Sequence, residues 1–228
     1  MKKILFLFFA LSSSLQASDI IPSVYSTGVN DFYNPLNDNS IDFHYSVKSP
    51  TGEQNFTYAV DPQIVSNPNN FGPRSMWLDP SSLNPTAKWI SFSTNPSSVD
   101  SRMTYDYETL FNIDRFQIDS VLISGKMSSS SSGSVYLNGN YLFSHYSTPD
   151  SETYRSLKSF NISNSTGFLL PGINRLTFEI SNGSPSMGFS PPSGLLVSMS
   201  GYGNVVPEPS SYILCGIGVI ALIFAMKK

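Results

Sequence analysis

The sequence predicts an all-β domain, a β-sandwich, placed between two apolar segments at the ends of the chain. Three observations lead to this prediction. Short runs alternate apolar and polar residues, Gly, Pro, Asn and Ser interrupt these runs, and no helical period occurs outside the two ends. The runs are unevenly spaced and several loops between them are long, which favours a sandwich over a closed barrel.

The expected strands can be placed in order along the chain. Asn138-Gly139, between two alternating runs, is typical of a tight β-hairpin turn, because both residue types tolerate positive φ. The runs that predict strands are residues 41–47, 56–60, 88–93, 103–110, 120–125, 134–137, 141–144, 160–163, 175–181 and 194–200.

Residues 1–17 have the features of a signal peptide. Met1-Lys2-Lys3 is a positive start, residues 4–11 are apolar, and small residues lead to a cleavage site after Ala17. We therefore expect the chain to be exported, with an uncleaved N-terminal anchor as the alternative.

Residues 206–228 are expected to form a membrane tail. Val206, Pro207, Glu208 and Pro209 form an extended spacer, because proline fixes φ and excludes helix. The apolar run 212–226 follows, and Lys227 and Lys228 end the chain as a cytoplasmic stop. A span of the bilayer takes roughly 20 apolar residues, so this shorter run suits a thin or locally compressed membrane. The alternatives are a buried core helix and a plain Pro-rich linker.

This combination of a signal peptide with Pro-Glu-Pro, an apolar helix and a basic end resembles the PEP-CTERM proteins of Gram-negative bacteria. The resemblance implies that exosortase, a membrane-embedded processing enzyme, is a partner and recognises Val206 to Pro209. It also implies that the protein is first anchored in the membrane and then placed at the cell surface or outside the cell.

The domain between the ends, residues 18–205, resembles a recurring PEP-CTERM ectodomain that is similar to the galactose-binding-like jelly roll. The resemblance implies a jelly-roll sandwich that binds sugars at its loop ends. At the loop where that pattern usually has an Asp-Asn pair, this sequence has residues 128–133, which are five serines followed by a glycine. The matching segments are residues 26–29, 42–45, 89–90, 105–111, 123–125, 136–139, 168–178 and 194–197.

Charge and cysteine content limit the classes of partner. Four of the 13 basic residues lie at the two ends of the chain, which leaves 9 basic against 16 acidic residues, a formal charge of −7 for the rest. Nucleic acid is therefore not an expected partner. The single cysteine, Cys215, lies in the apolar run, so the domain is expected to be stabilised by its core and not by disulfides.

Catalytic motifs are missing from the sequence. The two histidines, His44 and His145, stand in alternating runs or beside Ser and Tyr, and no metalloprotease, nucleophile-elbow or phosphate-loop motif occurs. We therefore expect no enzyme activity, no cofactor and no metal. Two alternatives stay open: carboxylates paired as in a glycosidase (Asp106 with Glu108, or Asp114 with Asp119), and calcium held by Asp31, Asn37, Asp38 and Asp42.

The predicted ligand site is the cluster of Trp77, Arg74 and Asp79. An aromatic ring stacks on a sugar while charged side chains bond its hydroxyls. The alternative is that Trp77 caps the core. The expected function is that of a non-enzymatic surface or extracellular-matrix protein that binds polysaccharide. The alternatives are an anchored structural ectodomain without a ligand and an exported glycan hydrolase, and the serines at 128–134 are expected either to carry glycans or to form a flexible loop.

Overall fold

The computed structural model of this chain describes residues 18–61, 77–96, 103–146, 150–181 and 193–207. These residues form one antiparallel sheet, so the all-β prediction is confirmed. The strands are β1 (Ser18–Ile20), β2 (Ile41–Lys48), β3 (Gln54–Ala59), β4 (Ile90–Ser91), β5 (Thr104–Asn112), β6 (Leu122–Ser129), β7 (Gly133–Leu137), β8 (Asn140–His145), β9 (Lys158–Ser163), β10 (Ile173–Ser181) and β11 (Leu195–Asn204). Short 3-10 turns are η2 (Pro80–Ser82), η4 (Ile118–Ser120), η5 (Asp150–Arg155) and η6 (Asn164–Thr166).

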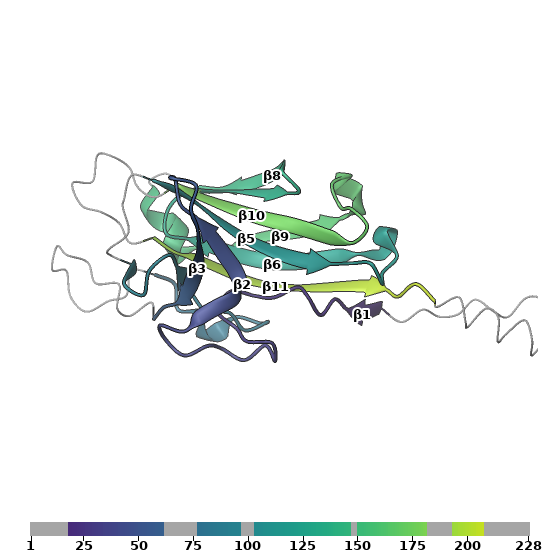
Figure 1. Ribbon diagram of the computed structural model, residues 1–228, viewed down its shortest axis with the longest axis horizontal. Helices are drawn as coiled ribbons and strands as arrows, with labels where there is room; N and C mark the ends of the chain where they lie inside the picture. Colours follow the sequence, from purple (N-terminus) through teal and green to yellow (C-terminus); the bar gives the residue numbers. More distant parts are fainter. Residues whose placement is uncertain (1–17, 62–76, 97–102, 147–149, 182–192, 208–228) are drawn as a thin grey trace, which may run out of the picture.

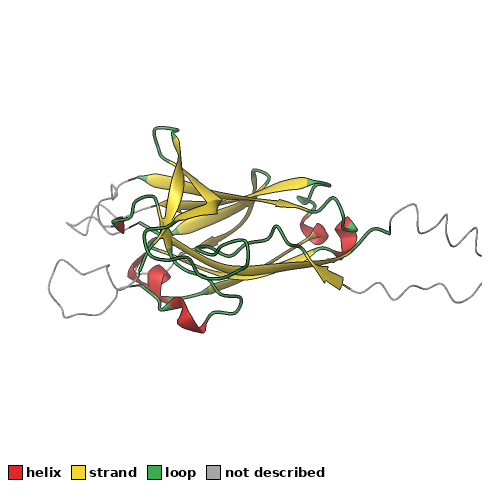
Figure 2. Cartoon of the chain, turned by 60° about the horizontal axis from the view of Figure 1, so that its bottom comes forward, coloured by secondary structure: helices red, strands yellow, loops and turns green. Residues whose placement is uncertain are grey.

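The sheet has the order β8-β7-β10-β5-β2-β3-β4-β11-β6-β9, and β1 pairs with β11. The sheet curls over into two layers (Figure 2). Residues of β5 and β10 share one core with residues of β6 and β11, and Figure 1 labels these four strands. The two edge strands, β8 and β9, come close together. Phe143 in β8 stacks on Phe160 in β9, and 5.5 Å separate the centroids of the two rings. The architecture is thus nearly barrel-like and compatible with a jelly-roll sandwich.

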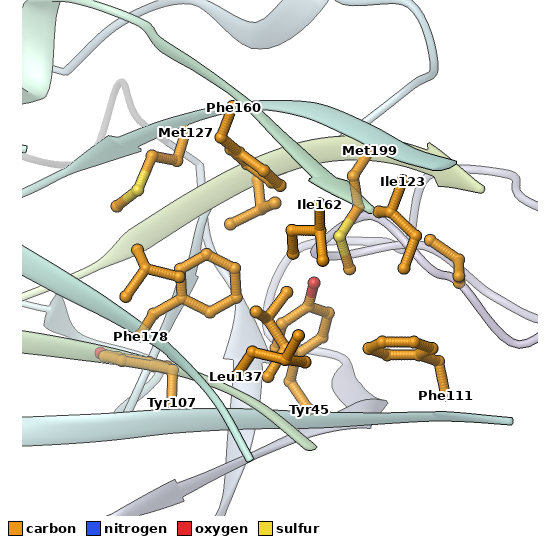
Figure 3. Packing of buried hydrophobic residues seen from close by; sticks show 14 of the residues in the cluster. Tyr45, Tyr107, Phe111, Ile123, Met127, Leu137, Phe160, Ile162, Phe178 and Met199 are labelled. Atoms are coloured by element: carbon orange, nitrogen blue, oxygen red, sulfur yellow. The ribbon is translucent and has the colours of Figure 1, made fainter. Parts of the chain in front are cut away.

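Strict alternation along the strands builds the main core. β5 and β10 bury every second residue, among them Tyr107 and Phe178, and these meet Met127 and Phe160 from the facing half of the sheet (Figure 3). The outward residues of the same strands remain at least partly exposed. This alternation is the pattern from which the sequence predicted these strands.

A second, smaller core lies on the other side of β11. Residues 77–89 cross the outer face of this strand and bury Trp77, Trp89 and Leu196 there. β11 is therefore covered on both faces over its first half, which explains why its first five residues are all buried.

The hairpin prediction at Asn138-Gly139 is confirmed. These two residues join β7 to β8 with φ values of 51° and 80°, the left-handed conformation that such a turn requires. The Asn138 side chain adds further support by accepting the Arg175 backbone N–H at 2.9 Å.

The serine-rich segment differs from the prediction. Ser128 and Ser129 belong to β6, and all four residues from Ser128 to Ser131 are buried. The turn η5 packs over β6, and Ser128 Oγ donates to the Thr153 carbonyl at 2.8 Å. The prediction of an open, glycan-carrying or flexible loop is therefore wrong for these four serines, because small side chains are what this covered strand accommodates.

The predicted terminal segments lie largely outside the described residues. Residues 1–17 are outside them, as are Glu208, Pro209, the apolar run and the two final lysines. Val206 and Pro207 are described and follow β11 without regular structure. Among the described residues, no helix is long and apolar enough to cross a membrane.

Candidate functional site

The predicted ligand cluster does not form an open platform. Trp77 is only 4% exposed and stacks on Trp89 with 4.3 Å between ring centroids. Asp79 caps η2 by accepting the Ser81 N–H at 2.9 Å, and Arg74 lies outside the described residues. Trp77 therefore has no free ring face for a sugar, and the alternative prediction, that it caps the core, describes its position.

A shallow hollow of about 390 Å³ lies beside this cluster. The described residues that line it are two prolines and Asp61, Asp79, Lys88 and small or aliphatic neighbours, with no aromatic ring among them. These described residues provide no aromatic surface on which a sugar ring could stack.

The four residues considered for calcium are mostly engaged elsewhere. Buried Asp42 accepts the backbone N–H groups of Gly28 at 2.7 Å and His44 at 2.9 Å. Asp38 pairs with Lys88, and Asp31 lies 3.0 Å from His44 Nε2. Within the described part of the chain, no three His, Cys, Asp or Glu residues are grouped to hold a metal ion.

The two histidines occupy different environments. His44 lies between acceptors, and its pKa is raised although burial opposes this, because hydrogen bonds to Asp42 and Asp31 favour the charged ring. His145 lies at the end of β8 near Ser156, and burial followed by the Lys158 charge lowers its pKa. The two rings thus differ in the direction in which their surroundings shift the pKa.

The two candidate carboxylate pairs lie in different parts of the structure. Asp114 and Asp119 lie in the connection after β5, where Asn112 and Asn164 side chains bond them. Asp106 and Glu108 instead point outward from β5, where Glu179 of β10 lies directly opposite Asp106. These three carboxylates belong to a larger polar surface that the sequence analysis did not identify.

We call this surface the outer polar face. It consists of two neighbouring rows of outward residues across the six strands β8, β7, β10, β5, β2 and β3, and the pairing of these strands fixes both rows. At a strand spacing of about 4.8 Å, each row is about 24 Å long. The first row is Tyr141, Tyr136, Thr177, Glu108, Ser46 and Phe56, and the second is Ser144, Ser134, Glu179, Asp106, Lys48 and Gln54.

Aromatic rings stand at both ends of the first row. Tyr136 and Tyr141 pack edge to face with 5.9 Å between centroids, and the Tyr141 hydroxyl lies 3.0 Å from Ser144 Oγ. At the opposite end, Phe56 packs edge to face on exposed Phe43 with 6.3 Å between centroids. The face therefore offers apolar ring surfaces with hydroxyl and carboxylate groups between them.

The charges in the middle of the face interact. Partial burial, and then the nearby Glu108 charge, raise the pKa of Asp106, while Lys48 acts in the opposite direction. Partial burial and the Asp106 charge likewise raise the pKa of Glu179. Arg175 Nη1 lies 4.0 Å from Glu108 Oε1, so this carboxylate has a cationic neighbour.

Comparisons with known proteins leave the family of this chain open. No family model and no curated protein matches the sequence. Among solved structures, an FMN-binding beta-glucuronidase from Facaelibacterium prausnitzii L2-6 is 17% identical with a TM-score of 0.39, and the match covers 81% of this chain and 22% of that one. A family 11 carbohydrate-binding module from Clostridium thermocellum, in complex with a beta-1,3-1,4-mixed-linked tetrasaccharide, is 12% identical with a TM-score of 0.36, over 82% of this chain and 100% of that one.

A putative beta-galactosidase from Bacteroides fragilis is 12% identical with a TM-score of 0.35, over 71% of this chain and 23% of that one. This chain thus spans less than a quarter of the length of the two glycosidases that it matches. With identities this low and TM-scores below 0.5, none of these proteins assigns an activity to the chain.

Proposed function

We propose that this protein is an exported, membrane-anchored surface or matrix protein that binds a polysaccharide through its outer polar face and catalyses no reaction. Its anchoring and its sorting by exosortase follow from the predicted signal peptide and the tail at residues 206–228. Carbohydrate binding follows from the outer polar face, which takes the place of the cluster at Trp77.

The observation that supports binding is the pairing of Tyr136 and Tyr141 at one end of two rows of polar side chains. Aromatic faces bury the apolar side of a sugar ring, and hydroxyl or carboxylate groups at fixed positions accept and donate hydrogen bonds. The face is open and about 24 Å long, so it suits a stretch of extended chain more than a single small sugar.

The charge of the face narrows the class of polysaccharide. Asp106, Glu108 and Glu179 stand together at its centre, with Lys48 opposite Asp106 and Arg175 beside Glu108, so acidic groups outnumber basic ones there. A polyanionic glycan would be repelled there, so a neutral polysaccharide is the expected ligand.

Affinity electrophoresis with neutral and acidic polysaccharides tests the proposal. We expect wild-type protein to be retarded by a neutral glycan and Tyr141→Ala to weaken the binding by about tenfold, the loss of about 1.4 kcal/mol. Tyr202→Ala is the matched control, because Tyr202 is also an exposed tyrosine but lies on β11, outside the face.

Three other outcomes would contradict this site or favour another class of protein. Equal loss of binding in Tyr141→Ala and Tyr202→Ala would contradict this site, and no retardation by any glycan would favour a structural ectodomain. New reducing ends that disappear in Glu179→Gln would instead favour a hydrolase that uses the Asp106 and Glu179 carboxylates.

A further inference from the structure

The two ends of the folded domain lie side by side. Ser18 pairs with Asn204 and Ile20 with Tyr202, so the first described strand runs along the last one (Figure 1). The chain then leaves β11 past the connection after β5, where the Val206 N–H donates to the Arg115 carbonyl at 2.8 Å. The predicted signal cleavage site and the start of the predicted tail are therefore neighbours at one end of the domain.

Exposed apolar side chains form a row at this end. Ile20, Tyr202 and Leu122 are direct partners across β1, β11 and β6, and they are 60%, 45% and 45% exposed. We call these three residues the terminal apolar strip. Single exposed apolar residues are common on protein surfaces, but a row of three in register is a continuous apolar patch.

Two further residues extend the apolar surface at the same end. Val206, directly before the predicted spacer prolines, is 47% exposed. On the facing half of the sheet, Ile173 opens β10 opposite Asn112, the last residue of β5, and is 65% exposed. Apolar side chains thus reach this end of the domain from both halves of the sheet.

We propose that the terminal apolar strip contacts the phospholipid bilayer surface and holds the anchored domain with this end against the membrane. The proposal rests on the membrane anchoring in the proposed function. Pro207 is five residues from Tyr212, where the apolar run begins, and a fully extended chain of that length spans at most about 18 Å. The strip is therefore tethered close to the hydrocarbon.

The chemistry of the strip fits the interfacial layer of a bilayer. Tyrosine is enriched at this depth because its ring is apolar and its hydroxyl remains hydrated. Asp19 lies within β1, and residues 18–205 carry 15 acidic against 9 basic residues, a formal charge of −6, so zwitterionic phospholipid is the expected surface and anionic lipid is not.

The test uses the full chain reconstituted in phosphatidylcholine vesicles. With Cys215→Ser as background, an environment-sensitive fluorophore is attached at Ile20→Cys, and at Tyr146→Cys as the control. The turn at Asn138-Gly139 lies at the same end as the strip, because Asn138 bonds Arg175 near the start of β10. β8 runs away from this turn, so the exposed Tyr146, which follows β8, lies at the opposite end of the domain. We expect blue-shifted emission at position 20, quenched by spin-labelled lipid, and aqueous emission at position 146.

The outcomes separate this proposal from those on which it depends. A chain that floats with the vesicles but shows aqueous emission at position 20 overturns the contact while leaving anchoring intact. A chain that does not float overturns both. Glycan binding, measured separately through Tyr141, is unaffected by either result.

Discussion

At the scale of single residues, His44 shows how a surface loop is tied to the sheet. Its Nδ1 lies 3.0 Å from the Val29 carbonyl and its Nε2 lies 3.0 Å from Asp31, while Tyr25 stacks on the ring at 3.6 Å. A neutral imidazole carries one N–H and can satisfy only one of these acceptors, whereas the protonated ring donates to both. The fold therefore favours protonated His44.

This preference predicts a pH dependence of stability. Because the pKa of His44 is raised from 6.5 in the folded state, its stabilisation is complete below pH 6.5 and is lost as pH rises through the folded-state pKa. As the pH is raised through this range, we expect the free energy of unfolding of the wild type, measured by urea denaturation, to decrease. The decrease should be smaller in His44→Gln.

His145 supplies the control. Its pKa is lowered, so its contribution has the opposite sign and is lost as pH falls below 6.5. The free energy of unfolding of His145→Gln should therefore still decrease as the pH rises above 6.5, as in the wild type. An equally steep decline in His44→Gln would contradict the role given to His44.

At the scale of elements, the segment that covers β11 depends on one close approach. Trp77 lies against Gly194, where an added Cβ would stand 2.4 Å from Cη2 of the indole. The Trp89 indole N–H donates to the Leu78 carbonyl at 2.8 Å, so the second tryptophan is bonded back to the same segment. Glycine at 194 is thus what lets this layer pack directly on the sheet.

Gly194→Ala should overpack this contact. We expect the free energy of unfolding to decrease by about 1–3 kcal/mol, the usual cost of forcing an extra methyl group into a packed core. In a Trp77→Leu background the same substitution should cost less, because the indole that it meets is gone. Equal costs in both backgrounds, by denaturation in a double-mutant cycle, would show that Trp77 is not the obstacle.

At the scale of the whole molecule, the nearly closed sheet brings β1 and the end of β11 together, while the outer polar face lies on the six strands from β8 to β3. In the proposed function, the glycan-binding face and the attachment to the membrane thus use different residues of the domain.

Intact mass and cell fractionation test the processing directly. In a host with exosortase, we expect loss of residues 1–17 and of the tail, with release from the membrane fraction. A host without exosortase should retain the tail and the membrane association. A retained tail in both hosts would contradict sorting and leave a simple anchored ectodomain.

The sequence predicted those parts of the fold that depend on neighbouring residues. Alternation along β5 and β10 and the positive φ values at Asn138-Gly139 are local requirements, and each was placed to within a few residues. The three-residue strand β1 was not predicted, because so short a segment shows no alternation. The serines of β6 were interpreted as a loop because the cover supplied by η5 comes from a distant part of the chain.

The sequence by itself determined the all-β class, the order of the main strands and the chemistry expected of the two chain ends, because these follow from local pattern and composition. Only the tertiary structure decided that Trp77 is buried, since its partners Trp89 and Gly194 are remote in sequence. It also decided which outward residues form one face: Tyr136, Thr177 and Glu108 align only through the registers of β7, β10 and β5. Such registers are set by packing between distant strands, and no local pattern specifies them.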